Sequence, residues 1–126
     1  MEKNLSIIIP VYNEKESLSL MVKILNSSLD FNHEIIIVYD DLNDNTLPEA
    51  RKLQQKFDNI ILVHNNYGRG VKYALEAGVQ KSKYQNILIT AVDEIFPILS
   101  IDKMLNMIVE ENYDFVSGTR YKNGGK

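Results

Sequence analysis

Residues 34–46, EIIIVYDDLNDNT, join an apolar run to a cluster of acidic side chains. Residues 35–38 are all β-branched, which favours a strand, and a strand without polar positions is typical of a sheet buried on both faces. Asp40, Asp41 and Asp44 follow within a few residues. The chain therefore has concentrated negative charge at the end of a buried strand. The neighbouring segments indicate what this charge is for.

On either side of this stretch, strand-like apolar runs alternate with segments whose apolar residues have helical spacing. Apolar side chains between the runs recur three and four residues apart, which predicts amphipathic helices. The first such helix carries Leu18, Met21, Val22, Leu25 and Leu29. Strands are predicted over residues 5–11, 34–39, 60–64, 87–91 and 115–117.

Three polar positions are predicted to begin helices. Asn13 has Glu16 three residues later, which resembles a helix start, and Ser100 can cap a fourth helix that carries Ile101. Residues 46–49, TLPE, are typical of a capping box with proline in the first turn.

The strand–helix alternation predicts an α/β fold with a mostly parallel sheet and helices on both faces. Ligands of such sheets bind outside the carboxyl ends of the strands. Polar segments follow all five predicted strands, and we expect the functional groups there. These segments are residues 10–14, 40–44, 65–70, 92–94 and 118–121.

Composition excludes several classes of protein. The 126 residues suffice for one domain, and a net charge of -3 argues against non-specific nucleic-acid binding. No cysteine is present, which excludes disulfides and thiolate metal sites. The N-terminal apolar run, residues 5–9, is too short for a signal peptide or a membrane span. His33 and His64 lack metal-ligand spacing, so structural roles are expected for both.

Two familiar α/β sites do not fit the positions of glycine and aspartate. A dinucleotide site needs G-x-G-x-x-G in the first turn, but residues 10–14 contain no glycine, and Tyr73 stands three past Gly70. Response-regulator receivers carry an acidic pair after the first strand and a phospho-acceptor aspartate after the third. This chain has NE at residues 13–14 and HN at residues 64–65.

Four segments resemble, in order, the motifs of one known family. They are SIIIPVYNEKESL (6–18), EIIIVYDDLNDNT (34–46), NNYGRGVKYALEAGV (65–79) and VSGTRYKNGG (116–125). The second resembles V-D-D-x-S-x-D-x-T, and the third resembles N-x-G-x-G-x-A-x-x-x-G. Together they resemble family 2 glycosyltransferases with the GT-A fold over nearly the whole chain. The last segment resembles the form commonest among polyprenyl-phosphate (dolichol-phosphate mannose synthase-like) members.

The resemblance implies a nucleoside pocket that includes Pro10, Tyr12, Glu14 and Asp40. In the family, the second aspartate of the pair accepts a hydrogen bond from the nucleotide base, and Asp40 holds that position. A carboxylate is acceptor-only, which suits the N–H donors on a uracil or guanine edge. Asp44 falls on the family's later aspartate, for which capping or loop ordering is expected.

The chain departs from the family pattern at three positions. Tyr39 replaces the first aspartate of the pair, Leu42 replaces a serine, and Ala91 replaces the first aspartate of the D-x-D motif. Asp93 falls on the second aspartate of that motif, the usual metal contact, and Glu94 could supplement it. The resemblance implies that Asp93 binds Mg²⁺ or Mn²⁺, which screens the charge of the diphosphate. The alternative is that this acidic turn is only solvated.

Gly68, Arg69, Gly70 and Arg120 complete the expected nucleotide-sugar-binding set. The two glycines either meet a need for positive φ or bring the backbone close to a ligand. Arg69 would then lie near the phosphates and stabilise their charge.

The resemblance implies that residues 1–126 form one nucleotide-sugar-binding domain, incomplete at the C-terminus. The full-length parent is expected to transfer a sugar from a UDP- or GDP-linked donor, with inversion, to an acceptor such as a polyprenyl phosphate. No catalytic base is assigned, because a phosphate acceptor needs none and the family's bases lie beyond Lys126. The alternative is a non-catalytic or degenerate nucleotide-sugar-binding module, since Tyr39 and Ala91 replace family aspartates.

We further expect a cytoplasmic protein, at the cytoplasmic face of a membrane if the full-length acceptor is a lipid. No nucleic-acid partner is expected. Self-association through an exposed apolar surface is expected if the acceptor-binding half is missing.

Overall fold

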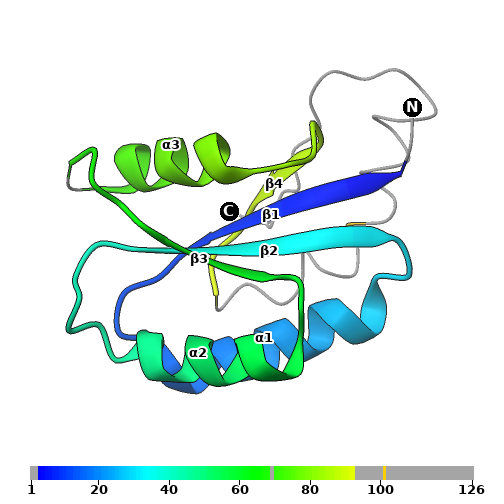
Figure 1. Cartoon of the computed structure of the whole chain (residues 1–126), viewed down its shortest axis with the longest axis horizontal. Helices are drawn as coiled ribbons and strands as arrows, with labels where there is room; N and C mark the ends of the chain where they lie inside the picture. Colours follow the sequence, from blue (N-terminus) through cyan, green and yellow to red (C-terminus); the bar gives the residue numbers. More distant parts are fainter. Residues whose placement is uncertain (1–2, 69, 93–100, 102–126) are drawn as a thin grey trace, which may run out of the picture.

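Four parallel strands form the central sheet, in the order β3-β2-β1-β4 (Figure 1). The computed structural model describes residues 3–68, 70–92 and 101. In chain order, the elements are β1 (Asn4–Pro10), α1 (Lys15–Ser28), β2 (Asn32–Tyr39), α2 (Thr46–Lys56), β3 (Ile60–His64), α3 (Val71–Lys81) and β4 (Ile87–Ile89).

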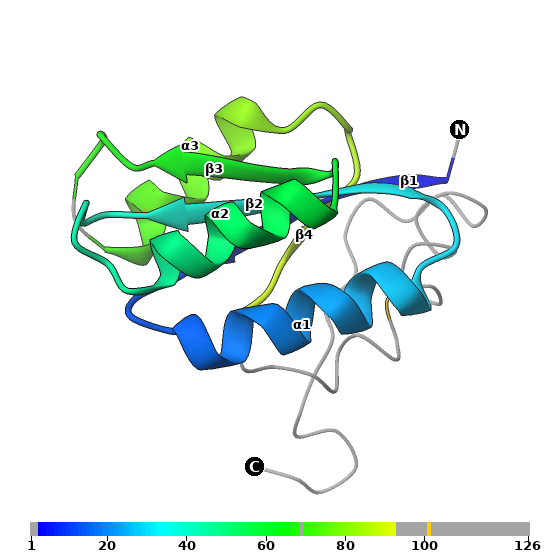
Figure 2. The same cartoon turned by 60° about the horizontal axis from the view of Figure 1, so that its bottom comes forward.

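The two faces of the sheet are covered by different helices, because successive strand side chains point to opposite faces. Ile7 and Ile9 of β1 pack in one core cluster with residues of α1 and α2, whereas Ile8 packs in a second cluster with residues of α3. Figures 1 and 2 show α1 and α2 on one side of the sheet and α3 on the other. All three isoleucines are fully buried, which stabilises the fold by about 1.5–3 kcal/mol each.

The predicted order of strands and helices is confirmed through β4, and so are the parallel sheet and the helices on both faces. Element ends differ by a few residues; β4, for example, ends at Ile89 and not at Ala91. The predicted fourth helix and the fifth strand, residues 115–117, lie outside the described residues. Ile101, which is described, is 2% exposed and belongs to the same core cluster as the apolar residues of α1.

The predicted helix starts at Asn13 and Thr46 are wrong in detail. Helix α1 begins at Lys15, with Glu14 at the N-cap, and neither α1 nor α2 has a side-chain cap from its own N-cap residue. Thr46 is the first residue of α2, and its hydroxyl accepts a hydrogen bond from the Glu14 backbone N–H instead of capping its own helix. The polar residues of these loops bond across to each other, as described below.

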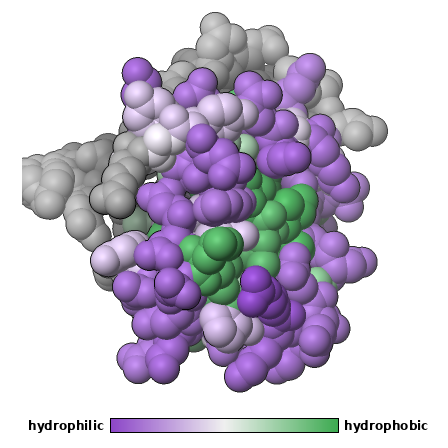
Figure 3. All heavy atoms as spheres, turned by 60° about the vertical axis from the view of Figure 1, so that its left-hand side comes forward, coloured by the Kyte–Doolittle hydropathy of each residue, from purple (hydrophilic) through white to green (hydrophobic). Residues whose placement is uncertain are grey.

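Because all strands are parallel, the loops after β1, β2 and β3 meet at one edge of the sheet. Figure 3 shows this side of the molecule, where an apolar area is surrounded by hydrophilic surface. Leu42, in the loop after β2, is 68% exposed. Among the described residues, no helix is both long and apolar enough to cross a bilayer.

Candidate functional site

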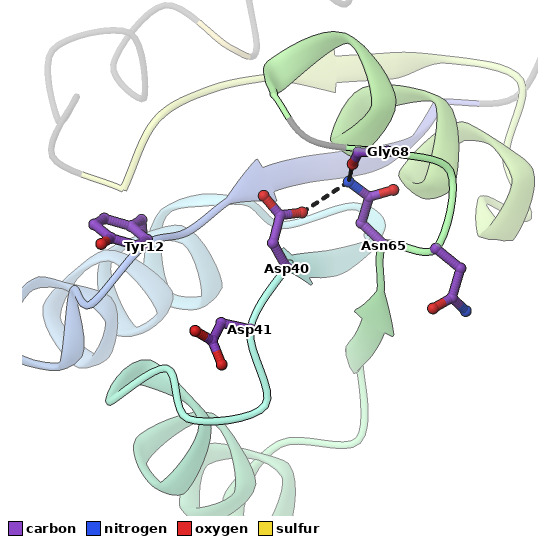
Figure 4. Close-up of a pocket in the computed structure, with 6 residues that line it drawn as sticks. Tyr12, Asp40, Asp41, Asn65 and Gly68 are labelled. Carbon is purple, nitrogen blue, oxygen red and sulfur yellow. Dashed lines mark hydrogen bonds between the residues drawn. The ribbon is translucent and has the colours of Figure 1, made fainter.

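A pocket of about 500 Å³ lies where the loops after β1, β2 and β3 meet (Figure 4). This volume is within the range of small-molecule sites, about 300–1,000 Å³. The pocket therefore lies at the predicted edge of the sheet. Its lining residues are Tyr12, Asp40, Asp41, Asn65, Asn66 and Gly68.

Asp40 follows β2 directly and is held through both its side chain and its backbone. Its Oδ1 accepts a hydrogen bond from Asn65 Nδ2 at 2.7 Å, and its carbonyl oxygen accepts one from His64 Nε2 at 3.0 Å. The His64 ring stacks on Tyr39, with ring centroids 5.1 Å apart. His64 thus has the structural role expected of it, and Tyr39 fills its position as an aromatic packing residue rather than as an acceptor.

Asn65 was not among the predicted site residues, although it lies in a predicted polar segment. It is 6% exposed, and its Nδ2 also donates to the Gly68 carbonyl oxygen at 2.7 Å. Its Oδ1 accepts a hydrogen bond from the Tyr67 backbone N–H at 3.0 Å. Its position directly after a predicted strand could have indicated a site residue. Its contact with Asp40, however, depends on β2 and β3 being neighbours.

Tyr12 extends from the loop after β1 and is 73% exposed at the pocket. A large, exposed aromatic ring beside a pocket is suited to stacking on a flat ligand. The next residue, Asn13, has a φ of +50°, the left-handed region that asparagine tolerates better than most residues. This backbone turn separates β1 from α1.

Hydrogen bonds between the loops after β1 and β2, together with one bond within the second loop, form a set of four that we call the loop staple. Asp44 Oδ1 accepts from the backbone N–H groups of Asn13 and Thr46, at 2.9 and 2.8 Å. Thr46 Oγ1 accepts from the Glu14 N–H at 2.8 Å, and Asn13 Oδ1 accepts from the Asn45 N–H at 3.0 Å. The expected loop-ordering role of Asp44 is confirmed, and the staple sets the position of Tyr12 relative to Asp40.

Pro10 and Glu14, two further predicted site residues, flank the pocket without being among the residues that line it. Pro10 ends β1 and lies opposite Val38 of β2. Glu14 Oε1 accepts a hydrogen bond from the Tyr12 backbone N–H at 3.1 Å. Glu14 therefore supports the backbone that carries Tyr12.

Gly68 lines the pocket, whereas Gly70 is the N-cap of α3 and is not among the lining residues. Their φ angles are +154° and +104°. Both are positive, as one of the two predictions for these glycines requires. A Cβ at Gly68 would also lie 3.0 Å from the Tyr73 ring.

Arg69, Asp93 and Arg120 lie outside the described residues, as does Glu94. Within the described part of the chain, no group of three or more histidine, aspartate or glutamate side chains could hold a metal ion. The metal site at Asp93 therefore stays a prediction.

The pocket lining is acidic. Asp40 and Asp41 contribute carboxylates, and none of the described lining residues is positively charged. Carboxylates attract N–H donors and repel phosphates. This described part of the pocket is therefore suited to the base of a nucleotide rather than to its diphosphate.

A parallel α/β sheet with a pocket outside the carboxyl ends of its strands places the chain in the class of Rossmann-like α/β domains. The model of glycosyl transferase family 2 matches residues 6–126, and the chain belongs to this family.

Curated relatives match almost all of this chain. It is 31% identical over 122 residues to a dolichol-phosphate mannosyltransferase from Pyrococcus furiosus, a match that covers 96% of this chain and 34% of the relative. It is 33% identical over 124 residues to an undecaprenyl-phosphate 4-deoxy-4-formamido-L-arabinose transferase from Proteus mirabilis, covering 94% and 37%. The chain thus spans about a third of the length of these relatives.

Solved structures confirm the GT-A fold. A fragment of Staphylococcus aureus TarS in complex with UDP-GlcNAc matches with a TM-score of 0.72 at 19% identity, over 95% of this chain and 38% of that one. The mannosyltransferase PcManGT from Pyrobaculum calidifontis, in complex with GDP-Man and Mn²⁺, matches with a TM-score of 0.62 at 21% identity, over 71% and 27%.

Proposed function

We propose that residues 1–126 form one domain that binds a nucleotide-diphosphate sugar, and that the full-length parent is an inverting glycosyltransferase. Relatives named for transfer to dolichol phosphate and undecaprenyl phosphate support a polyprenyl phosphate as acceptor. Such a phosphate is already anionic near neutrality and needs no general base. A cytoplasmic location, at the membrane face that carries the lipid acceptor, belongs to the same proposal.

The observation that carries this proposal is the carboxylate of Asp40 in the pocket opposite the exposed ring of Tyr12. The ring can stack on a nucleotide base, while the carboxylate accepts from an N–H on the base edge. Pro10 precedes the loop that carries Tyr12, and Glu14 supports its backbone. Gly70, Arg69 and Arg120 are assigned to the phosphates.

Loss of the Asp40 carboxylate should weaken binding of a nucleoside diphosphate by about 1.5–3 kcal/mol, the range for a hydrogen bond to a charged group. Calorimetry with UDP and GDP on wild type and Asp40→Ala measures this. Asp58→Ala is the matched control, because it removes another exposed carboxylate, just before β3 at the opposite edge of the sheet. Equal affinity of wild type and Asp40→Ala for both nucleotides would contradict the assignment.

We also propose that a divalent cation, Mg²⁺ or Mn²⁺, joins the diphosphate to Asp93. Asp93 follows β4 in the sequence, and Tyr12 follows β1. These two strands are neighbours in the sheet. When bound, the cation would neutralise charge on the departing diphosphate. The complex of PcManGT with GDP-Man and Mn²⁺ supports such a metal in a relative of the same fold.

One protein carboxylate holds such a cation weakly, so the nucleotide should supply much of the coordination. We expect little metal binding without nucleotide, and tighter UDP or GDP binding with Mn²⁺. Asp93→Asn should reduce this metal dependence more than Glu94→Gln does, as measured by calorimetry with and without Mn²⁺. Metal-independent binding that Asp93→Asn leaves unchanged would favour a solvated acidic turn.

A non-catalytic nucleotide-sugar-binding module is the second candidate. It is favoured by the Tyr39 ring, which stacks on His64 where the family has an acceptor side chain. Transfer assays on the full-length parent distinguish the two candidates, because a binding module would bind the donor and release no nucleoside diphosphate.

A further inference from the structure

We propose that Asn65 makes the pocket select a uracil base over guanine, an inference that rests on the proposed binding of a nucleotide at Asp40. The basis of this selection is the hydrogen bond that the Asn65 amide donates to one oxygen of the Asp40 carboxylate. That oxygen, Oδ1, accepts from Asn65 Nδ2 at 2.7 Å. In Figure 4 the second oxygen points away from Asn65, toward the side of the pocket where Tyr12 lies.

The orientation of the Asn65 amide is determined by its other partners. The Gly68 carbonyl oxygen can only accept, so Asn65 Nδ2 must face it. The Tyr67 backbone N–H can only donate, so Asn65 Oδ1 must face that group. The Asn65 backbone N–H donates to the Tyr39 carbonyl oxygen at 2.8 Å, which holds the residue against β2.

Asn65 therefore has no donor left for a ligand. An amide has two N–H donors, and Nδ2 already bonds to Asp40 Oδ1 and to the Gly68 carbonyl oxygen, each at 2.7 Å. The residue is 6% exposed, so it cannot swing toward a base without breaking buried hydrogen bonds. Its effect on a ligand acts through Asp40, which makes it a positioning residue.

The two candidate bases place different demands on Asp40. Uracil presents one N–H, at N3, between two carbonyl oxygens. Oδ2 of Asp40, which has no hydrogen-bond partner among the described residues, can accept it. Guanine presents two adjacent N–H donors, at N1 and N2, which pair best with both oxygens of one carboxylate. Because Oδ1 already accepts from Asn65, a guanine donor would have to share that oxygen with the amide and would pair less well than at an unshared oxygen. Poorly paired donors in a binding site lower affinity.

Calorimetry in the presence of Mn²⁺ with UDP, GDP and N3-methyl-UDP tests this on the 126-residue chain. We expect wild type to bind UDP at least about tenfold more tightly than GDP, which corresponds to one well-made hydrogen bond. N3-methyl-UDP should lose at least about tenfold in affinity, because its N3 cannot donate.

The variant for this test is Asn65→Ser. A serine hydroxyl can still accept from the Tyr67 N–H in a local turn, but it is too short to donate to Asp40. The variant should lower the UDP-to-GDP affinity ratio by about three- to tenfold, because both oxygens of Asp40 become available to guanine. A merely structural role of Asn65 would weaken both nucleotides equally and leave the ratio unchanged.

Asn86→Ser is the matched control. Asn86 is also 6% exposed, and its Nδ2 donates to the Asn4 carbonyl oxygen at the opposite edge of the sheet. It should keep the wild-type ratio.

The outcomes separate this inference from the proposed function. Equal UDP and GDP affinity in wild type, or an unchanged ratio in folded Asn65→Ser, overturns the selection of uracil and leaves donor binding intact. If wild type binds neither nucleotide, the proposed function fails and the inference fails with it. If Asn65→Ser does not fold, equal affinity of wild type for UDP and GDP still overturns the inference.

Discussion

Asp44 illustrates how a single buried carboxylate orders the site without lining it. The residue is 5% exposed, and one of its oxygens accepts two backbone N–H groups, from Asn13 and Thr46. Its other oxygen, Oδ2, has no hydrogen-bond partner among the described residues. Asp44 therefore contributes through one acceptor oxygen, which a neutral amide could also supply.

Asp44→Ala should lower the free energy of unfolding by about 2–3 kcal/mol, because both N–H groups lose their acceptor. Asp44→Asn should lose less, since an asparagine keeps one acceptor oxygen for them. Urea denaturation of the three proteins measures the difference. Wild-type stability of Asp44→Ala would mean that water replaces the carboxylate at no cost.

At the scale of elements, α3 packs on the sheet through Gly78. A Cβ placed on Gly78 would lie 2.6 Å from Cγ2 of Ile8, closer than real Cβ atoms come to other heavy atoms. Ile8 is fully buried in the middle of β1, and its branched side chain has little freedom to move away. Glycine thus allows the helix to approach β1 closely.

Gly78→Ala should destabilise the fold although alanine favours helices. The substitution gains about 1 kcal/mol of helix propensity, but overpacking a core typically costs about 1–3 kcal/mol. We expect a net loss of about 1 kcal/mol in the free energy of unfolding, measured by chemical denaturation. Gln80→Ala, at an exposed position of the same helix, should stay near wild type. A Gly78→Ala variant more stable than wild type would show that Ile8 repacks freely.

At the scale of the whole molecule, the two edges of the sheet have different roles. The carboxyl edge holds the pocket, whereas the amino edge holds a buried carboxylate, Glu34, which is 2% exposed. Glu34 Oε2 accepts from Ser6 Oγ at 2.6 Å and from the Lys83 backbone N–H at 2.7 Å. It thereby joins β1, β2 and the segment that leads into β4.

Glu34→Ala should therefore reduce stability without changing nucleotide affinity. The buried Ser6 hydroxyl and the part-buried Lys83 backbone N–H would lose their acceptor, which should lower the free energy of unfolding by about 2–4 kcal/mol. UDP affinity of the folded protein should stay within about twofold of wild type, because the change lies at the opposite edge of the sheet. Denaturation and calorimetry on wild type, Glu34→Ala and Glu34→Gln measure both, with a smaller stability loss expected for Glu34→Gln. A folded Glu34→Ala protein that no longer binds UDP would show that the two edges are coupled.

Much of the candidate site could be predicted because strand ends can be located from the sequence. Tyr12, Asp40 and Gly68 each follow a predicted strand, and the structure brings all three to one pocket. Asn65 and the loop staple could not be predicted, because their hydrogen bonds join loops far apart in the chain. The predicted capping role of Thr46 is wrong for the same reason, since the Glu14 N–H arrives from another loop.

The sequence by itself determined the order of strands and helices, because continuous apolar runs alternate with segments whose apolar residues recur every 3.6 residues. It also determined which segments reach the carboxyl edge, because parallel strands all end there. The tertiary structure decided which strands are neighbours, with β1 between β2 and β4, and which oxygen of Asp40 accepts from Asn65. The physical reason is that apolar periodicity is local, whereas the partner of a hydrogen-bonding side chain is chosen by the packing of distant elements.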